Sequence, residues 1–374
     1  MPDQTYLMRT PRSVDLEITS GCNASCRYCY YLNNQGVTYK DLSTERWLEV
    51  FAELSACQVM NVSLLGGEPL LRKDLFRLID GIVANRMRFD LMSNGSLLSS
   101  AFAERLAATG RCDQVQISLD GSSAEIHETL RGKGTFAPAV KAIENLQKVG
   151  LPVTVRVTVH PGNIDDLAAI TALLLDEMGL PSFSTNEASA LGSLDKYDGP
   201  TFMTPVQRLQ AMHNLADLDA CYPGRIEANA GPLADWKMFH AMEEARRGGL
   251  PIPGRGRLVG CGCHSQRLAI RADGAYIPCV MLPQMVLGQA GLDSLTEVWQ
   301  GAPALVALRE RRKIALTSFP ECLDCPWLAS CTGNCPGGAF TLTETVDRPC
   351  PSACLRKFQA ELAVHGLSLW DEHR

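Results

Sequence analysis

The sequence lacks several features that would place a protein in a specific class at once. No apolar run approaches the ~18 residues that a transmembrane helix needs, and the first residues, MPDQTYLMRTPRS, contain no apolar signal segment. A basic arm is also missing, and the net charge is −6, so non-specific binding to nucleic acid is not expected. We find no internal sequence repeat and no low-complexity tract. The sequence therefore predicts a cytoplasmic globular protein that binds neither membranes nor nucleic acid.

Cysteine, in contrast, is abundant, with 15 residues in a chain of 374. Disulfides are rare in the cytosol, so metal binding is the better interpretation of so many thiols. Cys57, Cys112 and Cys221 lie within helix or strand patterns, and we expect them at or near the core. The other twelve fall into two groups, three between 22 and 29 and nine between 261 and 354.

The first two thirds of the chain alternate short apolar strands with amphipathic helices. Ser43 is expected to cap the first of these helices, and the other helical patterns follow between the strands. Such a repeat predicts an α/β fold with a parallel sheet that curls into an incomplete barrel. The predicted strands are 14–19, 61–65, 88–93, 114–119, 153–159 and 181–185.

Four unusual loops follow the first four predicted strands. They are GCNASCRYCYY (21–31), GGEP (66–69), SNG (93–95) and DG (120–121). Functional loops of parallel barrels follow the carboxyl ends of the strands. Each loop alone could be an ordinary turn, but their shared position predicts one site at this rim.

The first loop spaces Cys22, Cys26 and Cys29 as C-x3-C-x2-C. Cubane iron–sulfur clusters usually take four thiolates, so three would leave one iron open to another molecule. A catalytic zinc ion also keeps an open position, but no histidine lies near these cysteines in the sequence. The spacing therefore favours an iron–sulfur cluster with an open iron.

This motif, with Tyr28 before the last cysteine, resembles that of the radical S-adenosylmethionine (SAM) superfamily. The resemblance implies a partial (β/α)6 TIM-like barrel whose cluster binds SAM and generates a 5′-deoxyadenosyl radical. It also implies that the glycine-rich loop meets the methionyl amine, since glycine permits close backbone approach. Arg131 is a candidate partner for the SAM carboxylate, with a solvated surface charge as the alternative. The expected SAM-binding residues are Gly66, Gly67, Glu68, Pro69, Ser93, Asn94, Ser118, Asp120 and Arg131.

The cysteines of the last third resemble those of the SPASM extension found in many radical SAM enzymes. They read G-x4-C at 274–279 and C-x2-C-x5-C-x3-C at 322–335, followed by Cys350 and Cys354. The resemblance implies two auxiliary 4Fe–4S clusters, hence three in all, whereas a zinc knuckle is the alternative. We expect Cys261, Cys279 and Cys335 to bind the first auxiliary cluster. The second is expected at Cys322, Cys325, Cys331 and Cys354. Either Cys263 completes the first auxiliary site, or that site has an open iron.

These motifs divide the chain into three predicted parts. Residues 1–230 form the radical SAM core, 231–258 a linking helical region, and 259–374 the SPASM domain with a C-terminal helix. The segments NRMRFDLMSNGSL, GLPSFSTNEAS, IEANAGPLA, IPGRGRLVGCG and CTGNCPGGAFTL also resemble the radical SAM/SPASM proteins of the SynChlorMet peptide cassettes. That resemblance implies oxidative modification, such as a crosslink, of a small ribosomally made precursor peptide. It also implies a flavodoxin- or ferredoxin-type reductant.

Two departures from the family pattern shape the prediction. Val280 stands where sulfatase-maturating relatives carry an aspartate that is a candidate base. This difference weakens the prediction that the enzyme forms formylglycine. Because only 21 residues precede Cys22, we expect no N-terminal leader-binding domain. Either a separate protein presents the peptide, or the enzyme binds it directly. A small-molecule radical dehydrogenase and a non-catalytic iron–sulfur electron carrier are two further candidate functions.

No general base is evident in the sequence, so the catalytic residues stay unknown. His127, His160, His240 and His264 are candidates by residue type. Separately, the polar loop at 195–197 is a candidate entrance for the substrate.

Overall fold

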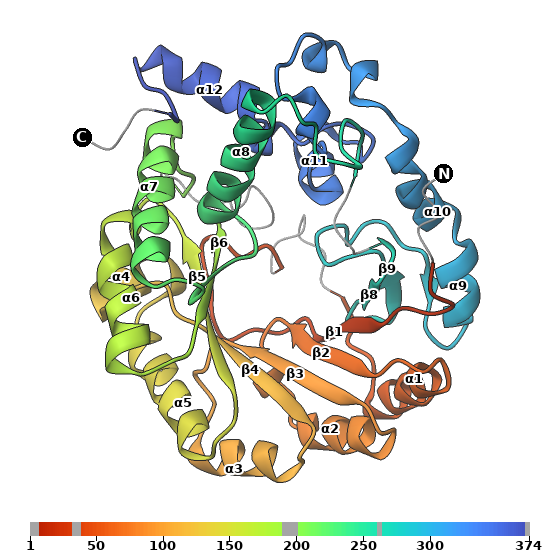
Figure 1. The fold of residues 1–374 in the computed structure, drawn as a ribbon. Coiled ribbons are helices and arrows are strands. Elements are labelled where there is room, and N and C mark those ends of the chain that lie inside the picture. The colour runs from red at the N-terminus through yellow and green to blue at the C-terminus, as the bar shows by residue number, and fades with distance from the viewer. Residues whose placement is uncertain (1–6, 32–38, 189–200, 260–263, 371–374) are drawn as a thin grey trace.

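The computed structural model describes residues 7–31, 39–188, 201–259 and 264–370. One ten-stranded sheet runs through them in the order β10-β9-β8-β1-β2-β3-β4-β5-β6-β7, and β1 to β7 are parallel in successive pairs. The sheet curves round the centre of the molecule, with helices α1 to α6 outside it (Figure 1). The strands are β1 (Ser13–Thr19), β2 (Asn61–Gly66), β3 (Arg88–Ser93), β4 (Cys112–Ser118), β5 (Val153–Val159), β6 (Phe183–Glu187), β7 (Ile226–Ala228), β8 (Arg267–Ile270), β9 (Ala275–Ile277) and β10 (Gly288–Gln289).

Helices connect consecutive strands of the barrel, as parallel pairing requires. Ser43 caps α1 by accepting a hydrogen bond from the Arg46 amide at 3.3 Å, as predicted. The barrel helices are α1 (Thr44–Ala56), α2 (Leu75–Ala84), α3 (Ser100–Ala108), α4 (Ala124–Arg131), α5 (Phe136–Lys148) and α6 (Leu167–Ala172), which continues as a π-helical turn over Leu173–Glu177. The later helices are α7 (Pro205–Cys221), α8 (Pro232–Arg247), α9 (Leu295–Gly301), α10 (Pro303–Glu310), α11 (Pro336–Thr343) and α12 (Leu355–Val364).

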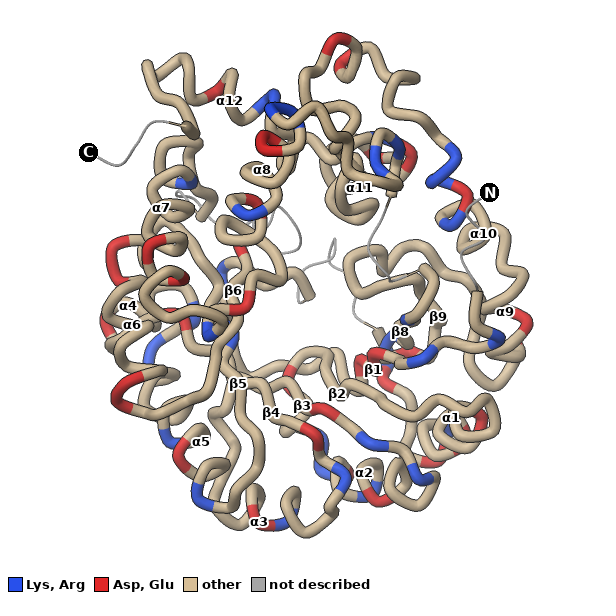
Figure 2. Tube along the Cα trace, in the orientation of Figure 1, with Lys and Arg blue, Asp and Glu red and all other residues tan. Residues whose placement is uncertain are grey.

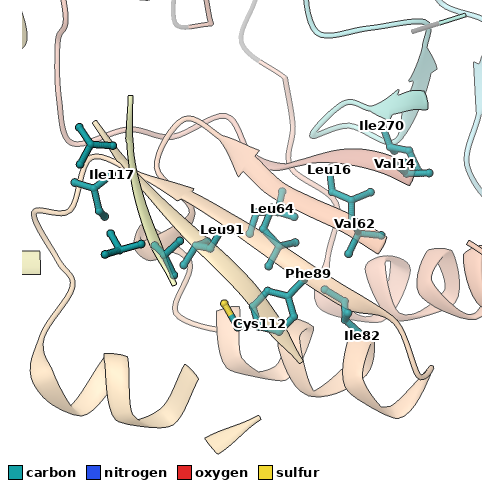
Figure 3. Close-up of a cluster of buried hydrophobic side chains, with 14 of the residues drawn as sticks. Val14, Leu16, Val62, Leu64, Ile82, Phe89, Leu91, Cys112, Ile117 and Ile270 are labelled. Atoms are coloured by element: carbon teal, nitrogen blue, oxygen red, sulfur yellow. The ribbon is translucent and has the colours of Figure 1, made fainter. Parts of the chain in front are cut away.

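The hydrophobic core lies between the barrel strands and these helices. Alternate side chains of β1 to β4 point outward and pack against the apolar face of the helices (Figure 3). Leu16, Leu64 and Leu91 occupy neighbouring positions on adjacent strands and are fully buried. Because strand side chains alternate between faces, the residues between them point into the barrel, and many of these are polar. Asp15, Ser63, Asp90 and Gln114 form one such row.

The last third of the chain joins this barrel through its backbone. β8 pairs in parallel with β1, with Leu16 opposite Ile270, and β9 and β10 follow as antiparallel strands. In Figure 1 these strands lie at one edge of the barrel, and α11 and α12 lie across the opening from β2 and β3. The predicted core and SPASM regions therefore share one continuous sheet.

The six predicted barrel strands and the partial barrel are confirmed. The expectation for Cys221 is wrong, because this last residue of α7 is exposed. Cys112 is buried in β4, and Cys57 is half-buried at the end of α1. In the described part of the chain, no helix is long and apolar enough to cross a membrane.

Candidate functional site

The cysteine loop that follows β1 lies at the carboxyl end of the barrel. Burial raises the pKa of Cys26 to about 11, and Arg131 is the strongest opposing influence, ahead of the repulsion from Cys29 and Cys22. Burial likewise raises the pKa of Cys22. Cys22 and Cys26 are thus protonated at pH 7 in the protein alone. Bound iron would displace these protons, because metals bind the thiolate.

The glycine-rich loop after β2 lies directly against this cysteine loop. The Gly67 amide donates to the Thr19 carbonyl at 2.8 Å, and the Glu68 amide donates to the Gly21 carbonyl at 2.8 Å. A Cβ atom on Gly67 would lie 2.0 Å from the Gly21 oxygen. The sequence suggested that glycine is needed here for approach to a ligand. The structure adds a second reason for glycine, which is that the backbone of this loop lies directly against the backbone of the cysteine loop.

The Glu68 carboxylate connects the second and third rim loops. It accepts hydrogen bonds from the Leu70 amide (3.1 Å), the Ser93 hydroxyl (2.9 Å) and the Asn94 amide (2.8 Å). Glu68 is 1% exposed, so these protein groups satisfy a carboxylate that water does not reach. The Asn94 side chain then donates to the Asn23 side chain at 2.9 Å, which links the third loop to the cysteine loop.

Asp120 and Arg131 form a buried ion pair behind the cysteine loop. The Arg131 Nε and Nη2 atoms lie 2.5 Å and 3.3 Å from the two Asp120 carboxylate oxygens. Arg131 is 8% exposed and Asp120 is fully buried, so the surface-charge alternative for Arg131 is wrong. Asp120 also accepts from the Tyr28 hydroxyl and, at 2.8 Å, from the Thr158 amide. These bonds leave fewer N–H groups of Arg131 for a ligand carboxylate.

Two histidines considered as bases lie beside this pair. The His127 Nδ1 atom accepts from the Asp120 amide at 3.0 Å, and the His160 Nδ1 atom accepts from the Gly162 amide at 3.1 Å. Burial lowers the pKa of both, to about 4 for His127. Both rings are therefore neutral at pH 7, and both carry structural hydrogen bonds.

An acidic strip of β1 faces the barrel interior. Asp15 and Glu17 are buried, and one carboxylate oxygen of each has no hydrogen-bond partner. Burial raises the pKa of Glu17 to about 8, against the opposing charge of Arg271. Figure 2 shows acidic positions on β1 next to basic positions near β8 and β9. This strip was not predicted, and its only signal in the sequence is VDLEIT, where two acids alternate within an apolar strand.

A second cysteine cluster lies between α8 and α12. Cys322, Cys325, Cys331 and Cys354 line one cavity, and each of the first three interacts electrostatically with Cys354. Cys350 lines the same cavity and lies 3.3 Å from the Ser352 hydroxyl. Apolar side chains complete the wall, among them Met242, Leu316, Trp327, Leu328 and Leu355.

Cys279 and Cys335 lie on neighbouring segments next to this second cluster. Cys335 precedes α11, and its Sγ atom would lie 3.6 Å from a Cβ built on Gly337. The same Cβ would lie 2.8 Å from the Cβ of Met281, two residues after Cys279. Cys261, Cys263 and the loop at 195–197 lie outside the described residues.

Among the residues that the structure describes, no three His, Cys, Asp or Glu side chains gather closely enough to hold a single metal ion. One set of thiols at the carboxyl end of a parallel barrel and a second set between α8 and α12 suit iron–sulfur clusters, whose ligands bind separate irons. Fold and site together are those of an iron–sulfur protein built on a partial βα barrel.

Comparison with known proteins gives the family. Residues 16–174 match the radical SAM superfamily, and residues 261–326 match an iron–sulfur cluster-binding domain of the SPASM type. The chain is 30% identical over 364 residues to the mycofactocin maturase MftC of Mycobacterium ulcerans, covering 94% of this chain and 89% of that protein. The chain therefore belongs to the radical SAM superfamily, carries a SPASM domain, and is an enzyme that binds SAM and iron–sulfur clusters.

Further relatives and a solved structure extend the comparison. The AdoMet-dependent heme synthase of Methanosarcina barkeri is 25% identical over 90% of this chain and 94% of its own. The PqqA peptide cyclase of Granulibacter bethesdensis is 26% identical over 92% and 87%. Streptococcus suis SuiB, crystallised with its precursor peptide SuiA, superposes with a TM-score of 0.69 at 16% identity, covering 93% of this chain and 76% of that one. This last likeness confirms the fold.

Proposed function

We propose that this enzyme uses SAM radical chemistry to modify a small, ribosomally made precursor peptide oxidatively, for example by a crosslink. The observation that carries the proposal is the pairing of two cysteine systems, one at the barrel rim and one beside it. Similarity to a maturase and to a peptide cyclase supports the choice of a peptide substrate. A pure electron carrier would need no three-cysteine site beside a glycine-rich rim.

Three 4Fe–4S clusters are proposed, with the ligands predicted from the sequence. The SAM-binding cluster is held by Cys22, Cys26 and Cys29. When this cluster is bound, it supplies the radical that takes a hydrogen atom from the substrate. Cys354 is preferred over Cys350 at the second auxiliary site, since it lies close enough to Cys322, Cys325 and Cys331 to interact with all three. The first auxiliary site uses Cys261, Cys279 and Cys335. Cys263 is its proposed fourth ligand.

The SAM site is proposed at the rim loops that follow β2, β3 and β4. Gly66, Gly67 and Pro69 offer backbone there, and Asn94 and Ser118 offer polar side chains. Glu68 and Ser93 carry hydrogen bonds between the loops after β2 and β3, and Asp120 accepts one from Thr158 of β5, so their proposed role is to fix the loops against the ligand. Arg131 retains its proposed contact with the SAM carboxylate through N–H groups that Asp120 does not use.

Two alternatives follow from specific observations. Similarity to a heme synthase makes a tetrapyrrole the second candidate substrate class. A sulfatase-type maturase is less favoured, because Val280 provides no acid beside Cys279. We propose that a flavodoxin or ferredoxin supplies electrons and that a separate protein presents the peptide.

The experiment is anaerobic reconstitution followed by reaction with SAM, a reductant and the peptide encoded in a neighbouring reading frame. We expect about twelve irons per chain, formation of 5′-deoxyadenosine and loss of two hydrogens from the peptide. About four irons, or zinc in their place, would contradict the cluster set. Modification of an iron porphyrin, with the peptide unchanged, would favour the second substrate class.

A further inference from the structure

The ion pair between Asp120 and Arg131 lies where the end of α4 meets the cysteine loop. Both residues are buried, and the guanidinium contacts the carboxylate through two nitrogens. Arginine stays charged in any protein environment. Burial alone would raise the pKa of Asp120, but the charge of Arg131 lowers it. Two opposite full charges therefore lie close together in surroundings of low polarity.

Three contacts hold this pair against the segment between two proposed cluster ligands. The Arg27 amide donates to the Leu130 carbonyl at 2.8 Å. The Arg131 guanidinium carbon lies 5.4 Å from the centre of the Tyr28 ring, and the Tyr28 hydroxyl donates to Asp120. The pair thus touches Tyr28, and Leu130, the residue before Arg131, touches Arg27.

Both charges act on the cysteine loop, because Arg131 lies against the Tyr28 ring and Asp120 accepts a hydrogen bond from the Tyr28 hydroxyl. His127 and His160 are neutral neighbours at pH 7 because burial lowers the pKa of both. Since charges act strongly at low local dielectric, each member of the pair influences a group held by this loop, and the two influences have opposite signs.

We propose that the Asp120–Arg131 pair sets the reduction potential of the cluster held by Cys22, Cys26 and Cys29. Reduction adds one electron, and therefore one negative charge, to the cluster. A fixed cation beside a ligand favours that reduced state and raises the potential, while a fixed anion lowers it. Arg131 and Asp120 are thus tuning residues with opposite effects. This inference depends on the cluster ligation given under Proposed function.

The experiment is a redox titration of the reconstituted enzyme without SAM, followed by electron paramagnetic resonance. The signal of this cluster is identified as the one missing from a Cys22/Cys26/Cys29→Ala variant. Arg131→Gln should lower its midpoint potential, and Asp120→Asn should raise it. The double variant carries neither charge and should lie between the single variants. Arg131→Lys keeps the charge and should stay near wild type.

A matched control separates charge from lost structure. Arg72 and Asp74 form another ion pair at 2.7 Å, and Arg72 also donates to the Ile18 carbonyl. Arg72→Gln should destabilise the fold without moving this midpoint potential. The inference would be overturned if the single variants of Arg131 and Asp120 shift the potential in the same direction, or do not shift it. Where a single variant fails to fold, the potentials of the double variant and of Arg131→Lys test the inference instead. A wild-type enzyme without this signal would overturn the ligand assignment as well.

Discussion

Glu17 carries a carboxyl group whose pKa is strongly raised in the barrel interior. Its carboxylate is buried, one oxygen has no partner, and its pKa is raised to about 8. Because the folded pKa exceeds the unfolded value of about 4.5, the protonated form stabilises the fold. That contribution is complete below pH ~4.5 and is lost as the pH rises through about 8.

Glu17→Gln should therefore make stability less dependent on pH. The glutamine keeps the shape of the protonated acid but cannot ionise, so the variant should gain stability over wild type on the alkaline side. The full shift corresponds to roughly 5 kcal/mol as an upper limit. Urea unfolding at pH 5 and pH 9 measures the change in the free energy of unfolding. Asp15 is present in both proteins, so its contribution to the two pH profiles is the same. Parallel pH profiles would show that Glu17 has an ordinary pKa.

Gly67 gives a second prediction for a single residue. A methyl group there would meet the Gly21 carbonyl oxygen at 2.0 Å, so Gly67→Ala must displace the loop that carries Cys22. We expect the reconstituted variant to lose about four irons and to stop cleaving SAM. Gly301→Ala is the matched control, because no atom lies within 4 Å of its added Cβ. Full iron content in Gly67→Ala would show that the loop adapts.

Among the elements, α8 holds the loop of the second cysteine cluster in place. The Glu243 carboxylate accepts from the Trp327 indole at 2.8 Å and from Arg246 at 2.7 Å. Trp327 lies between Cys325 and Cys331, and Glu243 is 5% exposed. This contact was not predicted, because nothing in the sequence relates residue 243 to residue 327.

Glu243→Ala should loosen this loop from α8. The half-buried Trp327 indole would lose its charged hydrogen-bond acceptor, at a cost of about 1–3 kcal/mol. We expect faster proteolysis near Trp327 and loss of iron from the second auxiliary site before the other sites. The adjacent Glu244 is exposed, so Glu244→Ala should change neither property. Equal protease resistance in both variants would contradict this role for α8.

The sequence predicted long, strongly patterned elements better than short ones. The strand predicted at 88–93 is observed as Arg88–Ser93, and the one predicted at 153–159 as Val153–Val159. In contrast, α4 and the short strand β7 were not predicted. α4 has eight residues and a Gly at its end, and β7 has three, which is too few for periodicity to appear.

The candidate site shows the same limit. Cysteine spacing located the thiols, because ligand geometry constrains neighbouring residues in the chain. Spacing could not show that Arg131 faces Asp120, or that Glu68 bonds to the amide of Asn94. Glu68 and Asn94 meet because the adjacent parallel strands β2 and β3 bring their carboxyl ends together. Arg131 meets Asp120 because α4, which follows the loop after β4, ends there, and both contacts are properties of the folded barrel.

At the scale of the whole molecule, the two cysteine systems should have separable tasks. A substrate that has lost a hydrogen atom must also lose an electron before a new bond is complete. Cys279→Ala removes a proposed ligand of the first auxiliary site, which we expect nearest the barrel strands because Cys279 follows β9. The rim site stays intact, so this variant should still form 5′-deoxyadenosine but yield little modified product.

The measurement compares 5′-deoxyadenosine with modified peptide by mass spectrometry. Circular dichroism must show native folding, because metal binding and folding are coupled in such domains. Cys221→Ala is the matched control, as this exposed thiol lies at the end of α7. A folded Cys279→Ala variant that modifies the peptide at the wild-type rate would make the auxiliary site structural.

The parallel pairing of β8 with β1 has a consequence for how the chain is made. During translation, Leu16 emerges long before its partner Ile270, and at ~5–20 residues per second the ribosome needs roughly 10–50 s to cover that interval. Throughout this time one edge of β1 has free backbone groups, and such edges recruit other strands. The nascent barrel thus passes through a stage in which aggregation competes with completion, and a chaperone that shields β1 would act during that interval.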